Sequence, residues 1–520
     1  MLRAITLIII FVAVKGDGCI RLSFGENGNV CVCNSTYCDS TEVPNYQHNQ
    51  FVWYISTKDS KMMEYSINNF STENDGNISQ TVTSNVLTIK SNIMYQKIFG
   101  FGGAMTDAAA LNIRNLSDGA QHKLLESYYG PNGSRYTFCR IPIAGTDFST
   151  RPYTYDDDPT DITLNHFSLV KEDEYKMQYL NYIKDIMPDP RELKIFATSW
   201  SAPAWMKKTN NIKYGSLKDK YYKVYADYIV KFIDAYKKRD IEIWGITPGN
   251  EPLDGIFPFF PFNSMSWLPN QSANWIVNDL SPALSKAGYE NLTIIAPDDQ
   301  RMTLSWYIGV MFKNEEAKKL ISGFAYHWYT DNIPFSSSIL TEMHIKYPDK
   351  FMLMTEACNG ASILNSSKAA VILGSWDRGE KYASDIIENL SHWGNGWIDW
   401  NLALNEEGGP NWVKNFVDSP IIVIPQKDEF YKQPTFYAIA HFSKFVPPGS
   451  HVIFSELEKS FLQKKYIEAI AFLTPEEKIV IVIVNTHVKN LNLTITDTVA
   501  NKTINLDLPA KSIHTISYSA

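Results

Sequence analysis

The sequence has 520 residues, more than one hydrophobic core usually supports, so we expect a large domain and at least one smaller one. Hydrophobic residues make up 44% of the chain and charged residues 20%, a globular composition that excludes extensive disorder. The formal net charge is -8 and no run of Lys and Arg stands out, which argues against a nucleic-acid partner.

The N-terminus has the pattern of a secretory signal peptide, which we place at residues 1–18. A basic Arg3 precedes an apolar run from Ala4 to Val14, and small or polar residues follow. The alternative is an uncleaved membrane anchor, but the run is shorter than the roughly 20 residues that a spanning helix needs. No later segment is long and apolar enough, so the sequence predicts no transmembrane segment and a protein soluble within the secretory pathway.

Cysteine and sequon usage agree with that compartment. Four of the six cysteines, Cys19, Cys31, Cys33 and Cys38, follow the predicted cleavage point and indicate two local disulfides of undetermined pairing. A zinc site is the alternative, which an oxidising lumen disfavours. Cys139 and Cys358 remain as predicted free thiols. Glycosylation sequons begin, among other places, at Asn34, Asn115, Asn291 and Asn389.

The middle of the chain alternates short apolar runs with longer amphipathic ones, a rhythm typical of a parallel α/β fold. The strand candidates lie near Ile98 to Gly102, Thr137 to Ile143, Ile195 to Trp200, Ile243 to Thr247, Thr293 to Ala296, Phe324 to Trp328, Phe351 to Thr355 and Trp397 to Trp400. Eight strands predict a (β/α)₈ TIM barrel. Residues 222–236 repeat apolar side chains at helical spacing, which predicts a helix face against that barrel.

The end of the chain alternates with period two, which predicts antiparallel sheet. The alternating runs are Ile467 to Phe472, Lys478 to Asn485, Asn492 to Thr496 and Ser512 to Ser517. Similar runs occur between Gln47 and Thr88, so we expect the two ends to form one β-sandwich. The predicted units are a disulfide-bonded β segment at 19–45 that packs with about 402–433, a sandwich from 46–94 plus 449–520, and a barrel from 95–401 plus 434–448.

In such a barrel the polar residues at the C-terminal ends of strands converge on one rim. Here they include Asp147, Trp200, Asn250, Glu251, His327, Tyr329, Glu356 and Trp400. Carboxylates, amides and tryptophans together are typical of a sugar pocket. Retaining glycosidases need two carboxyl groups about 5–5.5 Å apart, and Glu251 and Glu356, after strands four and seven, can face each other across the rim. Asn250 is suited to bind the sugar 2-hydroxyl. Ordinary loop or salt-bridge roles are the alternative for each glutamate.

Long motifs resemble glycoside hydrolase family 30, in particular its glucosylceramidases. They are GFGGAMTD at 100–107, LGSWDRG at 373–379, DWNLALN at 399–405 and GGPNWV at 408–413, which continues in NFVDSP at 415–420. The similarity extends over essentially the whole chain after the predicted signal peptide.

The resemblance implies a role for each site residue. Glu251 matches the acid/base and Glu356 the nucleophile. Asp147, Trp200, Asn250 and Asn415 match residues that bind glucose hydroxyls, and Trp400 matches a ring beside the sugar. His327 and Tyr329 match pocket residues near the nucleophile, Phe262 an aromatic on the aglycone side, and Arg140 a buried arginine that orients the nucleophile. For Arg140 a structural ion pair, and for the tryptophans a core position, are the alternatives. The disulfides implied are Cys19 to Cys31 and Cys33 to Cys38.

Three positions depart from the family pattern. Gly249 stands where animal members carry an acidic residue, Ser264 replaces a family cysteine, and the 359–368 loop differs. The first departure bears on the pH profile, because it removes a carboxylate near Glu251. The loop bears on lipid preference.

The function predicted from this resemblance is retaining hydrolysis of glucosylceramide to glucose and ceramide in the lysosome, reached through the secretory pathway, or as a secreted enzyme. We expect no metal or other cofactor, since two-carboxylate chemistry needs none. The implied partners are the membrane-held substrate, anionic lipid and a saposin-type activator. The alternatives are another β-glycoside substrate, such as a β-xyloside, a fucoside or a plant glucoside, or a non-catalytic carbohydrate-binding homologue.

Overall fold

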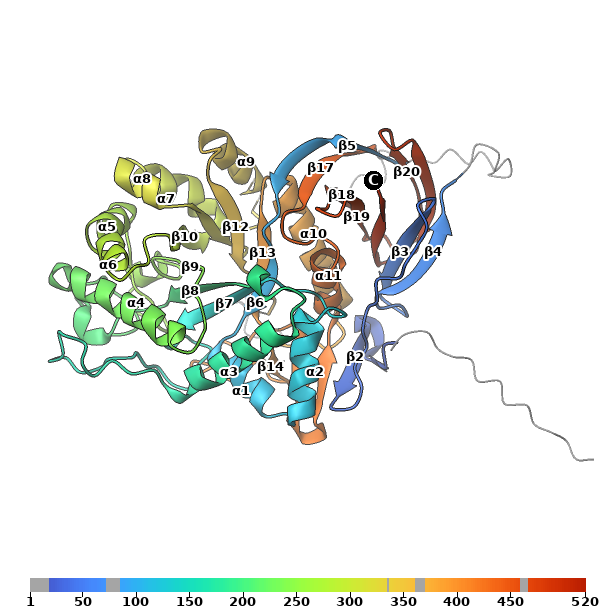
Figure 1. Ribbon diagram of the computed structural model, residues 1–520. Helices are drawn as coiled ribbons and strands as arrows, with labels where there is room; N and C mark the ends of the chain where they lie inside the picture. The colour runs from blue at the N-terminus through green and yellow to red at the C-terminus, as the bar shows by residue number, and fades with distance from the viewer. Residues whose placement is uncertain (1–17, 72–84, 334–335, 361–369, 459–465) are drawn as a thin grey trace, which may run out of the picture.

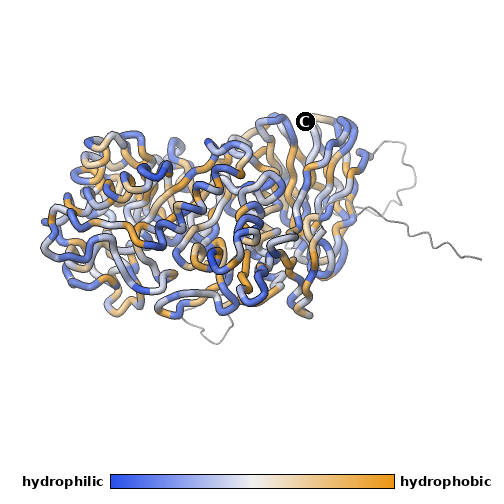
Figure 2. The backbone as a smooth tube through the Cα atoms, turned by 60° about the horizontal axis from the view of Figure 1, so that its bottom comes forward, coloured by the Kyte–Doolittle hydropathy of each residue, from blue (hydrophilic) through white to orange (hydrophobic). Residues whose placement is uncertain are grey.

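A computed structural model describes residues 18–71, 85–333, 336–360, 370–458 and 466–520. The predicted signal peptide, apart from residue 18, and most of the 359–368 loop lie outside these ranges. Figure 1 shows a barrel with its helices on one side and a curved β-domain on the other. Hydrophobic and hydrophilic stretches alternate along the chain, and many of the outer loops are hydrophilic (Figure 2).

The predicted (β/α)₈ barrel is confirmed, with eight strands that close in chain order. They are β6 (Gly100–Ala104), β7 (Phe138–Ile143), β8 (Lys194–Ser199), β9 (Gly245–Ile246), β10 (Thr293–Gln300), β11 (Gly323–His327), β12 (Phe351–Glu356) and β13 (Gly396–Asn401). A layer of fully buried apolar side chains fills the interior, one from each of six strands: Phe138, Phe196, Ile295, Ala325, Leu353 and Ile398. The barrel is therefore a packed core whose open end is the rim.

Helices pack around the barrel, and most of them contribute apolar side chains to the large cluster that surrounds it. Their bounds are α1 (Asp107–Arg114), α2 (Asp118–Tyr129), α3 (Lys171–Ile186), α4 (Tyr222–Lys237), α5 (Pro269–Trp275), α6 (Ser281–Lys286), α7 (Leu304–Met311), α8 (Glu315–Leu320), α9 (Ser336–Lys346), α10 (Trp376–Ser391) and α11 (Pro434–Ser443). The predicted helix at 222–236 is α4, which buries Tyr225, Tyr228, Ile229 and Phe232. Thr106 caps α1 by accepting a hydrogen bond from the Ala109 N–H at 3.0 Å.

The β-sandwich combines both ends of the chain in one nine-stranded sheet, in the order β21-β20-β5-β17-β18-β19-β22-β3-β4. Its strands are β3 (Gln50–Thr57), β4 (Glu64–Asn69), β5 (Val86–Lys97), β17 (His451–Glu458), β18 (Ile467–Leu473), β19 (Lys478–Asn485), β20 (Leu491–Asp497), β21 (Lys502–Leu508) and β22 (Ser512–Ser519). In Figure 1 the blue N-terminal strands lie beside the orange and red C-terminal ones. β5 pairs with β17, and β3 with β22.

Strand β19 joins the sandwich to the barrel. Ile479, Ile481 and Ile483 face the sandwich core, whereas Val480, Val482 and Val484 belong to the large cluster around the barrel. Because side chains alternate across a strand, one strand serves both cores.

Two buried histidines lie where α11 meets this sheet. His441 Nδ1 is 2.8 Å from Thr515 Oγ1, whose own hydroxyl donates to the His441 carbonyl, so Nδ1 carries the proton. His514 Nδ1 accepts from the Trp53 indole N–H at 3.0 Å, which leaves the proton on Nε2. Burial lowers the pKa of both imidazoles, that of His514 to about 3.

A small sheet carries the N-terminal segment, in the order β1-β2-β16-β15-β14. Its strands are β1 (Arg21–Ser23), β2 (Asn29–Asn34), β14 (Leu404–Asn405), β15 (Ile421–Ile424) and β16 (Glu429–Lys432). The implied disulfides Cys19–Cys31 and Cys33–Cys38 are present, which removes the zinc alternative for these four thiols. Cys139 and Cys358 are free and buried.

Two further sequence expectations concern the surface. None of the helices in the described ranges combines the length and apolar character needed to cross a bilayer. The Asn389 sequon lies within α10, and its side chain is 0% exposed. The Asn389 amide donates to the Asp385 carbonyl at 2.8 Å, so this asparagine cannot carry a glycan in the folded protein. Asn115 and Asn291 are exposed.

Candidate active site

A pocket of about 500 Å³ opens at the C-terminal ends of the barrel strands. Its lining includes nine of the residues expected from the sequence: Asp147, Trp200, Asn250, Glu251, Phe262, Tyr329, Glu356, Trp400 and Asn415. Arg140 and His327 do not line the pocket but lie directly behind it, each 0% exposed. The lining also includes Asp254 and Gln300, which sequence reasoning missed.

Glu356 ends strand β12, and its carboxylate is held from two sides. Arg140, from β7, donates to Oε2, and the Tyr329 hydroxyl donates to Oε1 at 2.7 Å. The same guanidinium donates to Asn250 Oδ1 at 2.8 Å and to Asp298 Oδ2 at 3.0 Å. Burial would lower the pKa of Arg140, but the charges of Asp298 and Glu356 raise it, so the group stays a cation. These contacts fix a carboxylate that is 7% exposed.

Glu251 follows β9 in a left-handed backbone conformation, with φ of 41°. Its N–H donates to the Asp298 carbonyl at 2.9 Å, which anchors the turn to β10. Glu251 Oε1 lies 2.9 Å from His327 Nδ1 and accepts from the Gln300 amide at 2.6 Å. The side chain is 14% exposed, and it faces the same cavity as Glu356.

The two carboxylates lie close together. One oxygen of Glu251, one of Glu356 and a ring nitrogen of His327 all lie within 4.8 Å of one another. Retaining glycosidases have carboxyl separations of about 5–5.5 Å, and inverting ones about 6.5–9.5 Å. The approach of these oxygens is closer to the spacing of retaining glycosidases than to that of inverting ones.

His327 lies behind the pocket wall and contacts two of the acidic residues. Nδ1 contacts Glu251, and Nε2 lies 3.0 Å from Asp298 Oδ1. Burial lowers the pKa of His327, but the charge of Glu356 and the hydrogen bonds to Asp298 and Glu251 outweigh it and raise the pKa to about 10. A protonated ring donates from both nitrogens and has no lone pair for a metal, although its distance to the two glutamates would suit a metal ligand.

Aromatic and polar side chains form the walls. The Trp200 and Trp400 rings stack with centroids 5.1 Å apart, and the Arg140 guanidinium lies 5.0 Å from the first ring and 5.1 Å from the second. Asp147 Oδ2 accepts from the Asn411 and Asn415 amides, each at 3.1 Å. Burial raises the pKa of Asp147 to about 7, partly offset by the Asn415 hydrogen bond.

The loop after Glu251 connects the pocket to the surface. Phe260 and Phe262 line the cavity, while Phe257 is 59% and Phe259 91% exposed. Phe259 has φ of 77°, a conformation that a bulky residue rarely adopts. The fold therefore holds a large apolar ring in solvent beside the pocket mouth.

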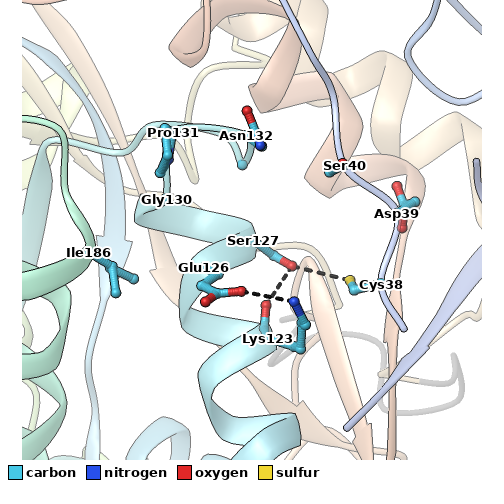
Figure 3. A pocket seen from close by; sticks show the side chains of 11 residues that line it. Cys38, Asp39, Ser40, Lys123, Glu126, Ser127, Gly130, Pro131, Asn132 and Ile186 are labelled. Carbon is cyan, nitrogen blue, oxygen red and sulfur yellow. Dashed lines mark hydrogen bonds and ion pairs between the residues drawn. The ribbon is translucent and has the colours of Figure 1, made fainter. Parts of the chain in front are cut away.

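A second cavity, of about 410 Å³, lies between α2 and the disulfide segment (Figure 3). Its acidic groups are paired: Glu126 contacts Lys123 at 3.2 Å, and Asp39 contacts Lys432 at 2.7 Å. It shares no lining residue with the carboxylate pocket. Of these two cavities, the one at the barrel rim has two glutamates whose carboxylates approach each other within 4.8 Å.

Comparisons with known proteins agree with this geometry. The chain matches the glycosyl hydrolase family 30 TIM-barrel domain over residues 98–446 and the family 30 beta sandwich domain over residues 449–516. It is 41% identical to lysosomal acid glucosylceramidase of Mus musculus, over 93% of this chain and 92% of the relative. It is 38% identical to putative glucosylceramidase 4 of Caenorhabditis elegans, over 95% of this chain and 94% of the relative.

Solved structures show the same architecture. SrfJ from Salmonella typhimurium superposes with a TM-score of 0.80 at 25% identity, over 91% of this chain and 100% of that one. The endo-beta1,6-glucanase BT3312 superposes with a TM-score of 0.77 at 25% identity, over 91% of this chain and 99% of the other. The barrel and the sandwich are the two domains that the family models describe, and the relatives match over more than nine-tenths of the chain. The chain therefore belongs to glycosyl hydrolase family 30 and is a glycoside hydrolase.

Proposed function

We propose that this enzyme is a retaining β-glucosidase that cleaves glucosylceramide to glucose and ceramide, with Glu356 as nucleophile and Glu251 as acid/base. The observation that carries the mechanism is the separation of the two carboxylates, within 4.8 Å. The identity to glucosylceramidases over more than nine-tenths of the chain supports the substrate.

In the first step, Glu356 attacks the anomeric carbon while Glu251 gives its proton to the ceramide oxygen, whose bond to the sugar breaks. Arg140 and Tyr329 hold the attacking oxygens in place through the hydrogen bonds described above. In the second step, Glu251 takes a proton from water, and that water releases glucose from Glu356. Two inversions give net retention.

The remaining pocket residues position the sugar. Asp147 and Asn415 offer an acceptor and a donor on one wall, and Asn250, held by Arg140, lies beside the nucleophile for the 2-hydroxyl. Trp200 and Trp400 form the apolar face against which a pyranose ring packs. On the aglycone side, Phe262 lies on the loop whose outer residues are exposed phenylalanines.

Those exposed rings support a substrate held in a membrane. Burying Phe257 and Phe259 in the interface of a bilayer would place the pocket mouth at the depth of a glycolipid headgroup. We place the enzyme in the lysosome, reached through the secretory pathway, with anionic lipid and a saposin-type activator as helpers at the lipid surface.

The test is hydrolysis of glucosylceramide in vesicles, with and without anionic lipid, against β-xylosides and β-fucosides. We expect cleavage of glucosylceramide, stimulation by anionic lipid and covalent labelling of Glu356 by a cyclitol epoxide. Phe257→Ser/Phe259→Ser should lower activity on vesicles but not on a soluble aryl glucoside. Val488→Ser, which alters a residue that is 73% exposed in the sandwich, is the control and should change neither.

Preference for another glycoside would overturn the substrate proposal. A label on any carboxylate other than Glu356 would overturn the mechanism.

A further inference from the structure

Glu251, the proposed acid/base, lies in an environment that is unusual for a proton donor. Its Oε1 accepts from Gln300 and contacts the His327 ring, which is a cation. Burial raises the pKa of Glu251, but the hydrogen bond and charge of His327, followed by the hydrogen bond of Asp254 and the charge of Arg140, together lower it. The cation beside Glu251 therefore favours its ionised form. Because Oε1 is fully engaged, Oε2 is the oxygen that remains for a further partner.

That partner is Asp254, three residues along the chain. The left-handed turn at Glu251 brings the Asp254 N–H within 2.9 Å of the Glu251 carbonyl and turns its side chain into the same cavity. The two carboxyl groups form a side-chain hydrogen bond, which requires a proton between them. Burial, followed by the charge of Glu251, raises the pKa of Asp254 far above the usual range.

We propose that Asp254 is a positioning residue for the acid/base, and that it shares one proton with Glu251 so that the resting enzyme keeps a proton donor at the glycosidic oxygen. This inference rests on the proposed role of Glu251. When Glu251 gives that proton to the leaving oxygen, Glu356 becomes an ester and loses its charge, so the net charge of the pocket does not change. The water of the second step returns the proton to the pair.

The other charged groups around the pair are fixed by their own contacts. They are Asp299 and Asp298 on β10, His327 on β11, Glu356 on β12 and Arg140 on β7. Asp299 accepts from the backbone N–H groups of Leu253 and Gln300, at 3.1 and 2.7 Å, so each of its oxygens already has a partner. Burial, followed by the charge of Glu251, raises the pKa of Asp299 to about 7. Of the described carboxyl groups, Asp254 is the one that bonds to Glu251.

The pair also bears on Gly249, where related enzymes carry an acidic residue. A Cβ at Gly249 would meet Trp267 Cδ1 at 3.5 Å and the Ser199 carbonyl at 3.6 Å, which are ordinary contacts. Gly249 adds no carboxyl group beside Glu251, but Asp254, which lines the same pocket, supplies one.

The experiment compares pH profiles of kcat/KM on an alkyl β-glucoside, whose departure needs protonation, for the full-length enzyme and three variants. Asp254→Asn places an amide donor beside Glu251 and should move the basic limb down by about one pH unit, so that the rate on that limb falls about tenfold. Asp254→Glu should restore the limb. Asp279→Asn removes the same charge outside the pocket and should leave the profile unchanged.

An aryl glucoside with an activated leaving group distinguishes the loss of the proton donor from a loss of structure, because the departure of that leaving group needs no proton. If Asp254 had only a structural role, Asp254→Asn would lower kcat/KM for both substrates at every pH and leave both limbs of the profile in place. That result would overturn the proposal. So would a basic limb that stays put in Asp254→Asn. If the wild-type enzyme prefers another glycoside, the proposed substrate fails, and the same profiles are measured with alkyl and aryl forms of that sugar.

Discussion

Acid should destabilise this enzyme through the two histidines between α11 and β22. Both imidazoles are neutral in the folded protein, because each uses one nitrogen as an acceptor and is fully buried. In the unfolded chain each binds a proton below about pH 6.5. A group with a lowered folded pKa contributes stability that is complete above its unfolded pKa and is lost as the pH falls toward the folded one.

The magnitude follows from the pKa of about 3 for His514. Between pH 7.5 and 4.5 the unfolded state gains a proton that the folded state does not bind, which costs about 2.7 kcal/mol. For a chain of this length the unfolding entropy is about 1.1 kcal/mol per degree, so the loss lowers Tm by about 2 to 3 °C. His441, with a pKa also well below 6.5, adds a loss of the same sign.

The perturbation is His514→Gln. Glutamine can accept from the Trp53 indole and donate to Ser512, as the imidazole does, but it cannot titrate. The assay is Tm by differential scanning fluorimetry from pH 7.5 to 4.5. We expect the variant to lose about 2 to 3 °C less than the wild type over this range. His48→Gln, at an exposed position, should behave as the wild type. Parallel curves for His514→Gln and the wild type would refute the reasoning.

Three further predictions concern catalysis and packing. Glu251→Ala should reduce cleavage of alkyl glucosides by about 10² to 10⁴ and activated aryl glucosides far less; equal losses would contradict its role as the acid. Glu356→Ala should abolish turnover, and azide should restore cleavage of an aryl glucoside to give the α-glucosyl azide by NMR; β-azide would exclude attack on the vacated face. Gly102→Ala should lower Tm or prevent folding, because its Cβ would lie 2.2 Å from the Phe138 carbonyl. Gly309→Ala, whose nearest neighbour would be Lys346 Nζ at 3.7 Å, is the control.

The barrel was predictable because its strands are buried on both faces and read as apolar runs. β9 shows the limit of that reading: its ladder includes only Gly245 and Ile246, while the candidate ran from Ile243 to Thr247. β21 was missed, although Ile504, Leu506 and Leu508 alternate there with exposed residues. The lysine, asparagine and aspartate of this edge strand gave it a polar composition that is typical of a loop.

The site was predictable where a residue ends a strand that had been identified. The fifth candidate stopped at Ala296, but β10 continues through a cis Ala296–Pro297 bond to Gln300. Asp298, Asp299 and Gln300 were therefore missed, although three polar residues in a row after an apolar run were a usable signal. Asp254 had no such signal, because only the backbone turn at Glu251 brings it into the pocket.

The pairing of β3 with β22 sets an order for biosynthesis. Residues 50–57 emerge from the ribosome early, together with their neighbour β4, yet the partners of residues 52–57 on the other side are residues 512–517. At a synthesis rate of roughly 5–20 residues per second, β3 waits about 20 to 90 seconds for β22. During that interval an apolar edge is open to wrong partners, and the barrel can be complete before the sandwich closes. A stop codon that removes only the last strand would therefore leave β3 and β19 permanently unpaired on one side and take Thr515 from His441 of α11, and it should send the truncated protein to degradation.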